Sequence, residues 1–551
     1  MNADMSSSFR RGNPALGGED VINMKKNIVL TAVIIAVFYG STLGNGFVHD
    51  DFWQVRDNPA IRDLGFLPKL FTGCIAESIL GGCKNIGFYY RPLQAVFYAF
   101  TYQISGQPWA FHLANLVYLF LLSLLLLKFF RLFLPEKFLP LLATLFVIAH
   151  PVNSEVVNWV SAAPELLLAI FVVGMFLAFV RYRKTGKNIF LITSVLAFLL
   201  ALFTKETALF LFLLLPLYTF LFSKAKTLRI LPVYFLPMLV YLSARSLVLG
   251  KIVYHYEGWY GLGFWPQVAN ALALYPRYLG KLIYPLPLNL QHPFNPVGMG
   301  DPQAFAGLIL LVLTAVVLIL AYKRKQKTLL IGLSFILLPL APALLFINKL
   351  GEFVFSERYL FISTIGFGLV VFELARIVLA KTTRAKLVRS VLFLTLIIYL
   401  GISGLIIWDR NKDWKDQVAS YKSILATFKA RSGLTFDYPK DWRIEEKEDT
   451  VFLFAPADDF QIQIAKNICP AGLTSEDYLA GQKNSFGQLL EQGPAKIPNT
   501  DSAYVRVWNS GSKSQLEFFL FKADAVIRVL VGPADSPQMK VFDAIVASLK
   551  S

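Results

Sequence analysis

The sequence predicts a polytopic α-helical membrane protein with about eleven transmembrane helices, followed by a soluble α+β domain. Of its 551 residues, 56% are hydrophobic and only 16% are charged, and the mean hydropathy is +0.54. A soluble protein carries far more charge. Many apolar runs approach the ~20 residues that cross a bilayer. After Trp408 the pattern changes to short alternating segments typical of a soluble domain.

The formal net charge of +17 has its source in the connections between apolar runs. A nucleic-acid-binding protein can show such an excess, but Lys and Arg cluster here as the positive-inside rule expects. The clusters are Arg10, Arg11, Lys25 and Lys26; Lys128, Arg131 and Lys137; Arg181, Arg183, Lys184 and Lys187; Lys224, Lys226 and Arg229; Lys323, Arg324, Lys325 and Lys327; and Arg376, Lys381, Arg384, Lys386 and Arg389. We therefore expect a membrane-lipid environment and no nucleic-acid partner.

With these clusters in the cytoplasm, the chain crosses the membrane an even number of times between consecutive clusters. The predicted spans are residues 28–43, 116–127 with their flanks, 139–149, 166–180, 189–203, 208–222, 230–249, 305–322, 329–346, 361–374 and 391–408. Residues 1–27 are then a cytoplasmic tail. The first span lacks a small-residue cleavage site after it, which indicates a retained anchor. The protein is expected in the cell membrane or an equivalent inner membrane, with its C-terminus outside the cytoplasm.

Residues 251–302 lie outside on this topology, and the aromatic stretch 265–284 is expected at the membrane interface or re-entering it. Polar residues that interrupt apolar sequence also fall on the outer side. They are Asp50, Asp51, Arg91, His150, Glu155, Glu165, Lys205, Glu206, Arg245, Glu357 and Arg358. Ionisable residues at membrane depth usually have a function. We therefore predict one polar cavity at the outer face that collects them.

The pair Asp50–Asp51 opens the outer loop 46–90 directly after the first span. It is either a polar stop at the end of a span or a functional carboxylate pair. A carboxylate at the membrane–water boundary suits a general base that acts on a hydroxyl. The same pair suits a divalent cation. No cofactor is firmly predicted, so a metal held by Asp50 and Asp51 remains an alternative.

The other candidates have a functional and a structural interpretation each. Arg358 and Arg91 suit the binding of a phosphate, which a guanidinium clamps with two hydrogen bonds, and Glu357 could orient Arg358. Lys205 and Glu206 are substrate-binding candidates or a pair that neutralises itself. His150 is a ligand-binding residue or only a satisfied polar group.

No P-loop, GxSxG or HExxH motif occurs in the sequence, so the usual soluble enzymes have no support. Carboxylates, phosphate-binding arginines and a membrane cavity together fit transfer of a sugar from a polyprenyl phosphate carrier. The rival hypotheses are a transporter or flippase for a lipid-linked intermediate and a non-catalytic membrane binding protein.

Cys74 and Cys83 share the first loop and can pair in an oxidising compartment, which leaves Cys469 over. Residues 426–551 are predicted to form one compact α+β domain. Its expected strands begin with the FDYPKDW segment and continue at 451–454, 460–465, 502–508, 515–522 and 525–531, with helices at 475–492 and 537–549. It holds no nucleophile–base constellation, which favours a binding or spacer role.

Several sequence blocks resemble one known family. The runs FVHDDFWQVRDNPAI, YYRPLQAVFYAFTYQISGQPWAFHLANLVYL and AHPVNSEVVNWVSAAPELLLAIF, then FTKETALFL, SERYLFISTIGFGL and DRNKDWKDQ, are similar to the transmembrane and tetratricopeptide-repeat O-mannosyltransferases. The resemblance covers about residues 28–425. It implies an integral-membrane type C glycosyltransferase fold and a polyprenyl- or dolichyl-phosphate sugar, with mannose favoured.

The resemblance also implies residue roles. Asp50 is the expected general base, Asp51 shapes the site, and Arg91 and Arg358 engage the carrier phosphate. The substrate-binding set is completed by residues inside the matching blocks, namely His150, Glu155, Glu165, Lys205 and Glu206. Direct displacement of the phosphate by the acceptor inverts the anomeric centre.

Two departures from the family bear on the substrates: the first removes a possible cation before Glu165, and the second leaves the acceptor open between a protein Ser or Thr and a glycan. Ala163–Pro164 stands where relatives commonly have Gly–Arg. The tetratricopeptide repeats are missing, and residues 433–550 instead resemble a PsbP-like domain.

Overall fold

The computed structural model describes residues 18–74, 89–222, 225–250, 261–290, 292, 294, 296–350, 354–416, 425–429, 435–439, 442–447, 450–454, 461–468, 488–494, 502–510, 513–522, 525–532 and 545. The chain divides into two compact units. The first comprises residues 1–288 and 296–417, and the second comprises residues 289–295 and 418–551. Each unit is described by itself.

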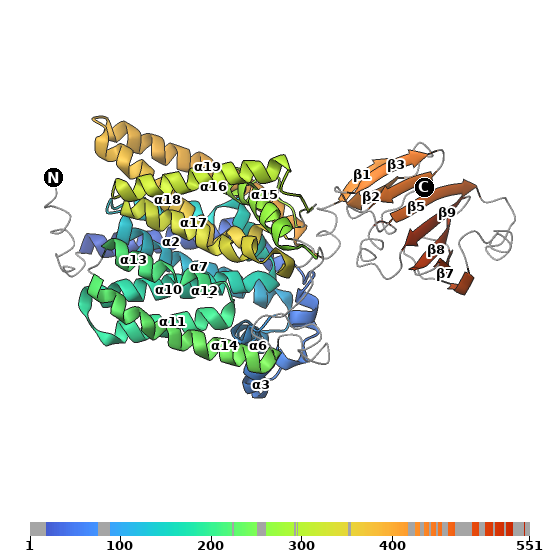
Figure 1. Cartoon of the computed structure of the whole chain (residues 1–551), viewed down its shortest axis with the longest axis horizontal. Helices are drawn as coiled ribbons and strands as arrows, with labels where there is room; N and C mark the ends of the chain where they lie inside the picture. The colour runs from blue at the N-terminus through green and yellow to red at the C-terminus, as the bar shows by residue number, and fades with distance from the viewer. Residues whose placement is uncertain are drawn as a thin grey trace. The chain divides into compact units, whose positions relative to one another are not determined.

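The first unit is helical, and its long helices run side by side (Figure 1). The α-helices are α2 (Gly18–Tyr39), α3 (Leu67–Thr72), α6 (Pro92–Ile104), α7 (Pro108–Phe133), α8 (Leu139–Ile148), α9 (Ser154–Asn158), α10 (Ala163–Thr185), α11 (Asn188–Thr204), α12 (Ala208–Leu211), α13 (Leu214–Phe222), α14 (Phe235–Leu249), α15 (Phe264–Ile283), α16 (Pro302–Lys323), α17 (Lys327–Leu345), α18 (Phe361–Lys381) and α19 (Ala385–Asp413). Short turns join them: η1 (Gly40–Gly44), η2 (Phe52–Arg56), η3 (Pro59–Ile61), η4 (Leu64–Phe66), η5 (Pro151–Asn153), η6 (Val160–Ala162), η7 (Ala225–Tyr234), η8 (Ile347–Lys349) and η9 (Glu357–Leu360).

Within the described residues, eight helices are long and apolar enough to cross a membrane, or nine if one bent pair counts as a span. The eight are Lys25–Gly44, Pro108–Phe133, Val160–Thr185, Arg229–Leu249, Pro302–Lys323, Lys327–Leu345, Glu357–Lys381 and Ala385–Asp413. The bent pair, Leu139–Ile148 with Pro151–Asn158, turns by 51° at the break before Pro151. A proline cannot continue the hydrogen-bond ladder of a helix, which explains the break. The polytopic helical prediction is thus confirmed.

Each of the eleven predicted spans coincides with helical structure, but three of them are short. The bent pair accounts for one, and Asn188–Thr204 and Ala208–Phe222 are shorter apolar helices. The count of eleven spans therefore stays a prediction.

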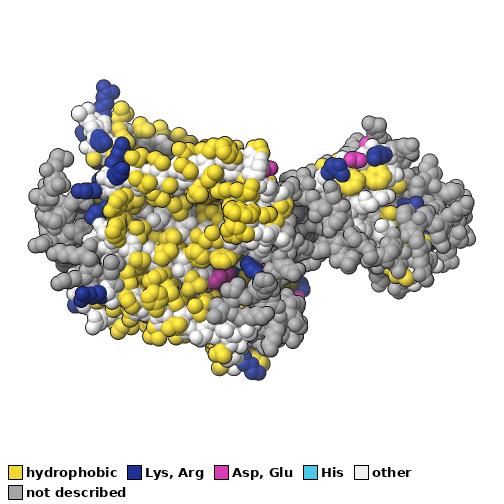
Figure 2. All heavy atoms as spheres, in the orientation of Figure 1, with side chains coloured by type: hydrophobic (Ala, Val, Ile, Leu, Met, Phe, Trp, Pro, Cys, Tyr) yellow, Lys and Arg dark blue, Asp and Glu magenta, His cyan; other side chains and the backbone are white. Residues whose placement is uncertain are grey.

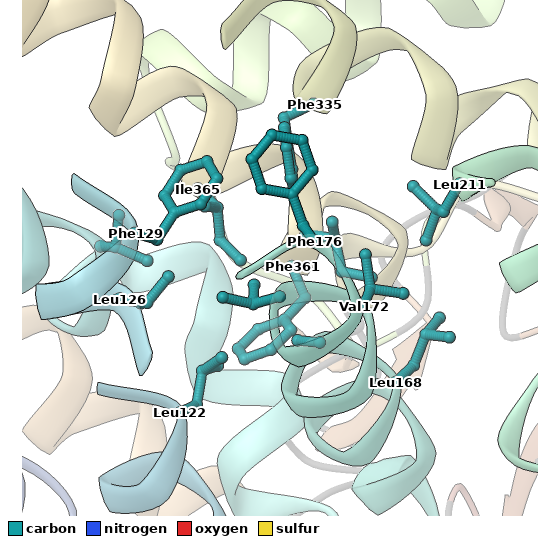
Figure 3. Close-up of a cluster of buried hydrophobic side chains, with 14 of the residues drawn as sticks. Leu122, Leu126, Phe129, Leu168, Val172, Phe176, Leu211, Phe335, Phe361 and Ile365 are labelled. Atoms are coloured by element: carbon teal, nitrogen blue, oxygen red, sulfur yellow. The ribbon is translucent and has the colours of Figure 1, made fainter. Parts of the chain in front are cut away.

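Four helices meet in one part of the larger apolar core of the first unit. Figure 3 shows side chains from α7, α10, α17 and α18 meeting in one cluster, with Leu211 of α12 at its edge. The rings of Phe129 and Phe335 lie 5.0 Å apart, and those of Phe129 and Phe176 lie 5.6 Å apart, edge to face. Such aromatic pairs stabilise a packed core beyond their buried area. This core supports the helix ends that carry the polar residues.

Helix α15 is the predicted interfacial stretch. It has one buried face, including Asn270 and Tyr278, while Phe264 and Trp265 are exposed. It packs so closely on α16 that a Cβ atom at Gly307 would overlap the carbonyl group of Leu272. The stretch is thus a helix of 20 residues that does not meet the criteria for a membrane span.

Basic side chains gather at one end of the helical unit. Lys327 lies over the ring of Phe222, 5.2 Å from its centroid, and Arg389 lies over Phe138 at 5.0 Å. Figure 2 shows hydrophobic side chains over the middle of the unit and Lys and Arg toward the left of the view. An apolar belt with charge beyond it is the surface of a membrane protein. Which end faces the cytoplasm stays a prediction.

Cys74 is disulfide-bonded. Cys83 and Cys469 lie outside the described residues, so the pairing of Cys74 with Cys83 stays a prediction.

The second unit contains a seven-stranded antiparallel sheet with the order β3-β4-β5-β9-β8-β7-β6, and a separate hairpin of β1 and β2 (Figure 1). The strands are β1 (Leu425–Lys429), β2 (Thr435–Pro439), β3 (Arg443–Lys447), β4 (Thr450–Phe454), β5 (Gln461–Ile468), β6 (Gln488–Pro494), β7 (Ser502–Ser510), β8 (Lys513–Lys522) and β9 (Ala525–Gly532). One face holds an apolar core that includes Leu453, Ile464, Ile527 and Val529. The opposite face buries Trp508, whose Nε1 donates to Glu517.

Six strands were expected, and all six are present as β2, β4, β5, β7, β8 and β9. The expected helix 475–492 is wrong at its C-terminal end, because β6 occupies residues 488–494 and pairs with β7. Tertiary pairing overrides helix propensity here. The rest of that segment, and the expected helix 537–549 apart from the buried Ile545, lie outside the described residues. A PsbP-like fold stays a prediction.

Candidate active site

A cavity of about 440 Å³ opens among the loop after α2, α6, η6, α10, α14, α17 and η9. Six of the nine predicted site residues line it: Asp50, Arg91, Glu165, Lys205, Glu206 and Arg358. Arg245, which the topology placed at the same face, lines it as well. Segments far apart in the chain therefore meet at one cavity, but the predicted polar cavity is lined in part by apolar side chains and does not collect Asp51, His150, Glu155 or Glu357.

Asp50 stands at a distinctive turn of the backbone. His49 before it has φ of 49°, in the left-handed region that a non-glycine residue rarely adopts. Directly after the acidic pair, η2 forms a single π-helical turn, which returns Trp53 and Gln54 to the carboxylate. Trp53 Nε1 donates to Asp50 Oδ1 at 3.1 Å, and Gln54 Nε2 lies 3.5 Å from Oδ2. The local fold thus holds a partly exposed carboxylate in the cavity wall.

Asp51 has a different environment, because its side chain is completely buried and does not line the cavity. Its carboxylate accepts hydrogen bonds from Val48 N, Ser161 N and Ser161 Oγ, at 3.1, 2.7 and 2.5 Å. Burial raises the pKa of Asp51 to about 7, against the lowering effect of these hydrogen bonds. Asp51 therefore fastens the first loop to η6, and the two aspartates are not equivalent.

The donor set does not fit a metal ion shared by the two aspartates. Both carboxylate oxygens of Asp51 are engaged by protein N–H and O–H groups. Within the described part of the chain, no group of three or more His, Cys, Asp or Glu side chains could hold a metal ion.

Two cations in the cavity are held by carboxylates from other segments. Arg91 Nε and Nη2 donate to Glu206 at 3.1 and 2.6 Å, and Lys205 pairs with Glu165. Burial alone would raise the pKa of Glu206, but the charge and hydrogen bonds of Arg91 outweigh it and lower this pKa to about 2. Lys205 and Glu206 thus bond to different partners, and the self-neutralising alternative is not what the structure has.

Arg358, which lines the cavity, forms an ion pair with Glu155, which is buried and does not line the cavity. Arg358 donates from its backbone N and from Nη1 to the two oxygens of Glu155, at 3.0 and 2.8 Å. Its guanidinium lies over the rings of Trp159 and Tyr359, 5.0 and 5.1 Å from their centroids. Glu155 thus positions Arg358.

Two other predicted residues lie apart from the cavity lining. Glu357 is buried and lies 3.7 Å from Lys281 Nζ, so the residue that orients Arg358 is Glu155 and not its neighbour. His150 is buried with Nε2 3.0 Å from the carbonyl of Leu282, and its ring packs edge-on against Phe146. Its other ring nitrogen, Nδ1, is buried without a hydrogen-bond partner in the described part of the chain, so His150 is only half satisfied and lies away from the cavity.

Sequence reasoning missed several lining residues, among them Gln54, Gln94, Ser161, Trp159, Tyr359 and Lys349. The amides of Gln54 and Gln94 carry no charge that a bilayer would penalise, so the sequence offers no strong signal for these two residues. The only available signal for Gln94 is its position three residues after Arg91.

One part of the cavity lining is charged and another part is apolar. Its described cationic residues are Arg91, Lys205, Arg245, Lys349 and Arg358, against the acidic residues Asp50, Glu165 and Glu206. A second wall is apolar, built from Leu209, Phe210, Leu242, Pro339, Pro342 and Phe346. Five cations against three acids give the lining an excess of two positive charges. Such a cavity suits a ligand with an anionic head and an apolar tail.

Fold and cavity together define a polytopic membrane protein with a positively charged site at the end of its helices. Comparison with known proteins then identifies its relatives. Over 456 residues, 75% of this chain, it is 25% identical to protein O-mannosyl-transferase TMTC3 of Homo sapiens, of which it covers 49%. It is 25% identical over 452 residues to TMTC3 of Mus musculus, covering 74% of this chain and 48% of that protein.

The chain is also 26% identical over 164 residues to protein O-mannosyl-transferase Tmtc2 of Drosophila melanogaster. This shorter match covers 29% of this chain and 17% of that protein. No family model matches the chain. The chain spans about half the length of the TMTC3 relatives it matches. It is thus related to the transmembrane and tetratricopeptide-repeat O-mannosyltransferases, and the predicted resemblance is confirmed.

Proposed function

We propose that this protein is a membrane glycosyltransferase that moves a sugar, with mannose favoured, from a polyprenyl- or dolichyl-phosphate carrier to a hydroxyl acceptor. One observation carries the proposal: Asp50 shares a cavity with five cationic side chains and an apolar wall. A carboxylate, a phosphate site and an apolar groove are what this reaction requires. The names of the TMTC relatives support a mannosyl transfer.

The charge of the lining suits the leaving group. A sugar linked to a lipid through a phosphodiester carries one negative charge, and the lipid phosphate that leaves carries about two at neutral pH. The excess of positive charge therefore stabilises the departing phosphate more than the bound donor. Interactions that strengthen as charge develops are the ones that accelerate a reaction.

The chemistry is a single displacement. The acceptor oxygen attacks C1 of the sugar, the bond from C1 to the phosphate oxygen breaks, and Asp50 accepts the hydroxyl proton. The electron pair of the broken bond goes to the lipid phosphate, which Arg91, Lys205 and Arg358 bind. Attack opposite the leaving group inverts the anomeric configuration.

The acceptor is a protein Ser or Thr or a glycan, and the site faces away from the cytoplasm. The relatives' names support a protein acceptor. In our proposal the second unit binds the acceptor.

Purified protein in detergent, incubated with radiolabelled polyprenyl-phosphate mannose and a Ser/Thr-rich peptide or a glycan, tests the proposal. Transfer of label to either acceptor supports a transferase. A flippase would move the intact carrier between the leaflets of a liposome and label no acceptor in detergent, and that pair of results would replace the proposal.

A further inference from the structure

A line of amide side chains runs along one wall of the cavity between Arg91 and Asp50. Arg91 caps α6, and Gln94 follows it by one helical turn. Gln94 Nε2 donates to Gln54 Oε1 at 2.7 Å, and Gln54 Nε2 in turn lies 3.5 Å from Asp50 Oδ2. Both glutamines line the cavity, although their side chains are more than nine-tenths buried.

The carboxylate at one end of this line fixes the direction of every hydrogen bond. An ionised carboxylate only accepts, so Gln54 turns its nitrogen to Asp50 and its oxygen to Gln94. Gln94 must then donate. Its second N–H goes to the hydroxyl oxygen of Tyr98 at 2.9 Å, because that hydroxyl donates to the carbonyl of Val160.

The remaining polar atom of this line is the side-chain oxygen Oε1 of Gln94. Among the residues that the structure describes, none donates a hydrogen bond to it. Because Gln94 lines the cavity, this amide oxygen is an acceptor that a ligand in the cavity can use. The donor that the cavity's ligand can bring is a hydroxyl group.

We propose that Gln94, oriented by Gln54, binds the hydroxyl at C2 of the transferred sugar and so selects between sugars that are epimers at C2. The inference rests on the proposed function. Arg91 holds the phosphate on C1, and Asp50 must reach the acceptor next to C1. A sugar held in this way would turn the carbon beside C1 toward the wall between these two residues, and Gln94 stands in that wall.

The test compares polyprenyl-phosphate mannose with polyprenyl-phosphate glucose, which differ only in the configuration at C2. We expect the unmodified protein to prefer mannose in kcat/KM. In Gln94→Leu, which removes the acceptor oxygen at nearly constant volume, the preference should shrink about 10-fold, the size expected for one lost hydrogen bond to a substrate hydroxyl.

Gln103→Leu is the matched control, because Gln103 lies on the same helix, is exposed and does not line the cavity. Its epimer preference should equal that of the unmodified protein. Gln94→Met also lacks the acceptor oxygen but fills the same space with a flexible side chain, so it should lose the preference likewise and covers the case in which Gln94→Leu does not fold.

Three results overturn the inference. An active Gln94→Leu variant whose rates for both donors fall equally shows that Gln94 only supports Asp50. A Gln94→Met variant that keeps the full preference excludes the role of the acceptor oxygen. If the unmodified protein transfers neither sugar, the proposed function itself fails, and that outcome is distinct from an unchanged epimer ratio.

Discussion

Replacing Glu155 by Gln tests whether this buried carboxylate positions the phosphate-binding arginine. The change keeps the shape of the side chain and one acceptor oxygen but removes the negative charge behind Arg358. Glu155 is 1% exposed, and it accepts from both the backbone N and Nη1 of Arg358. The variant therefore leaves a guanidinium without its buried counter-charge.

The magnitude follows from burial and geometry. Removing one partner of a buried ion pair typically costs about 3–5 kcal/mol. The Arg358 side chain is 23% exposed and keeps its contacts with Trp159 and Tyr359, so we expect about 3 kcal/mol of lost stability, at the lower end of that range. A displaced guanidinium should also lower kcat/KM for the lipid donor by roughly 10–100-fold, the worth of a charge-assisted hydrogen bond.

The assay combines thermal unfolding in detergent with donor titration. Glu373→Gln is the matched control, because Glu373 is 2% exposed and forms a bidentate pair with Arg376 that does not line the cavity. Both variants should melt at lower temperature, and only Glu155→Gln should bind donor poorly. If the two variants have the same donor KM, the positioning role of Glu155 is refuted.

Three further predictions concern other parts of the protein. Burial raises the pKa of Asp51 to about 7 in the folded protein, whereas this pKa is near 3.8 in the unfolded chain. The folded protein therefore binds the proton more tightly, and the free energy of unfolding should fall by up to roughly 4 kcal/mol as pH rises from about 4 to 7. Melting curves of Asp51→Asn recorded over this pH range should lack this contribution. Arg91→Lys should raise the donor KM about 10-fold, since a lysine keeps the charge but cannot bind two phosphate oxygens at once, and it should lower the melting temperature because the bidentate pair with Glu206 is lost; an unaltered KM would argue against phosphate binding there. Gly307→Val should destabilise the protein by about 1–3 kcal/mol, because the valine side chain would overlap Leu272. Gly401→Ala is the control: no atom lies within 4 Å of a Cβ atom at Gly401, so this variant should melt like the unmodified protein.

The membrane architecture could be predicted from sequence because hydropathy alone decides which segments enter a bilayer. All eleven predicted spans coincide with helical structure. The clustering of Asp50, Arg91 and Arg358 in one cavity also followed from topology, since loops on one side of a membrane share a face.

The partners of the charged residues could not be predicted. Lys205 pairs with a residue 40 positions away, Arg91 with one 115 positions away and Arg358 with one 203 positions away. Such pairs depend on helix crossing angles and side-chain directions, which local sequence does not determine.

In the second unit, the strands with alternating apolar residues were predictable, whereas β3 was missed. Its sequence, RIEEK, is mostly charged, and it forms a strand at the edge of the sheet by pairing with β4 on one side. Charged residues are common on edge strands, where they oppose pairing with another chain.

The role of Asp50 is the central claim, and one measurement tests it most directly. Purified unmodified protein and Asp50→Asn are compared for transfer of label from polyprenyl-phosphate mannose to acceptor, with binding of the donor measured in parallel. The account predicts that Asp50→Asn binds the donor but transfers about 10²–10⁴-fold more slowly, the contribution of a positioned general base. Transfer by Asp50→Asn at the unmodified rate would contradict it.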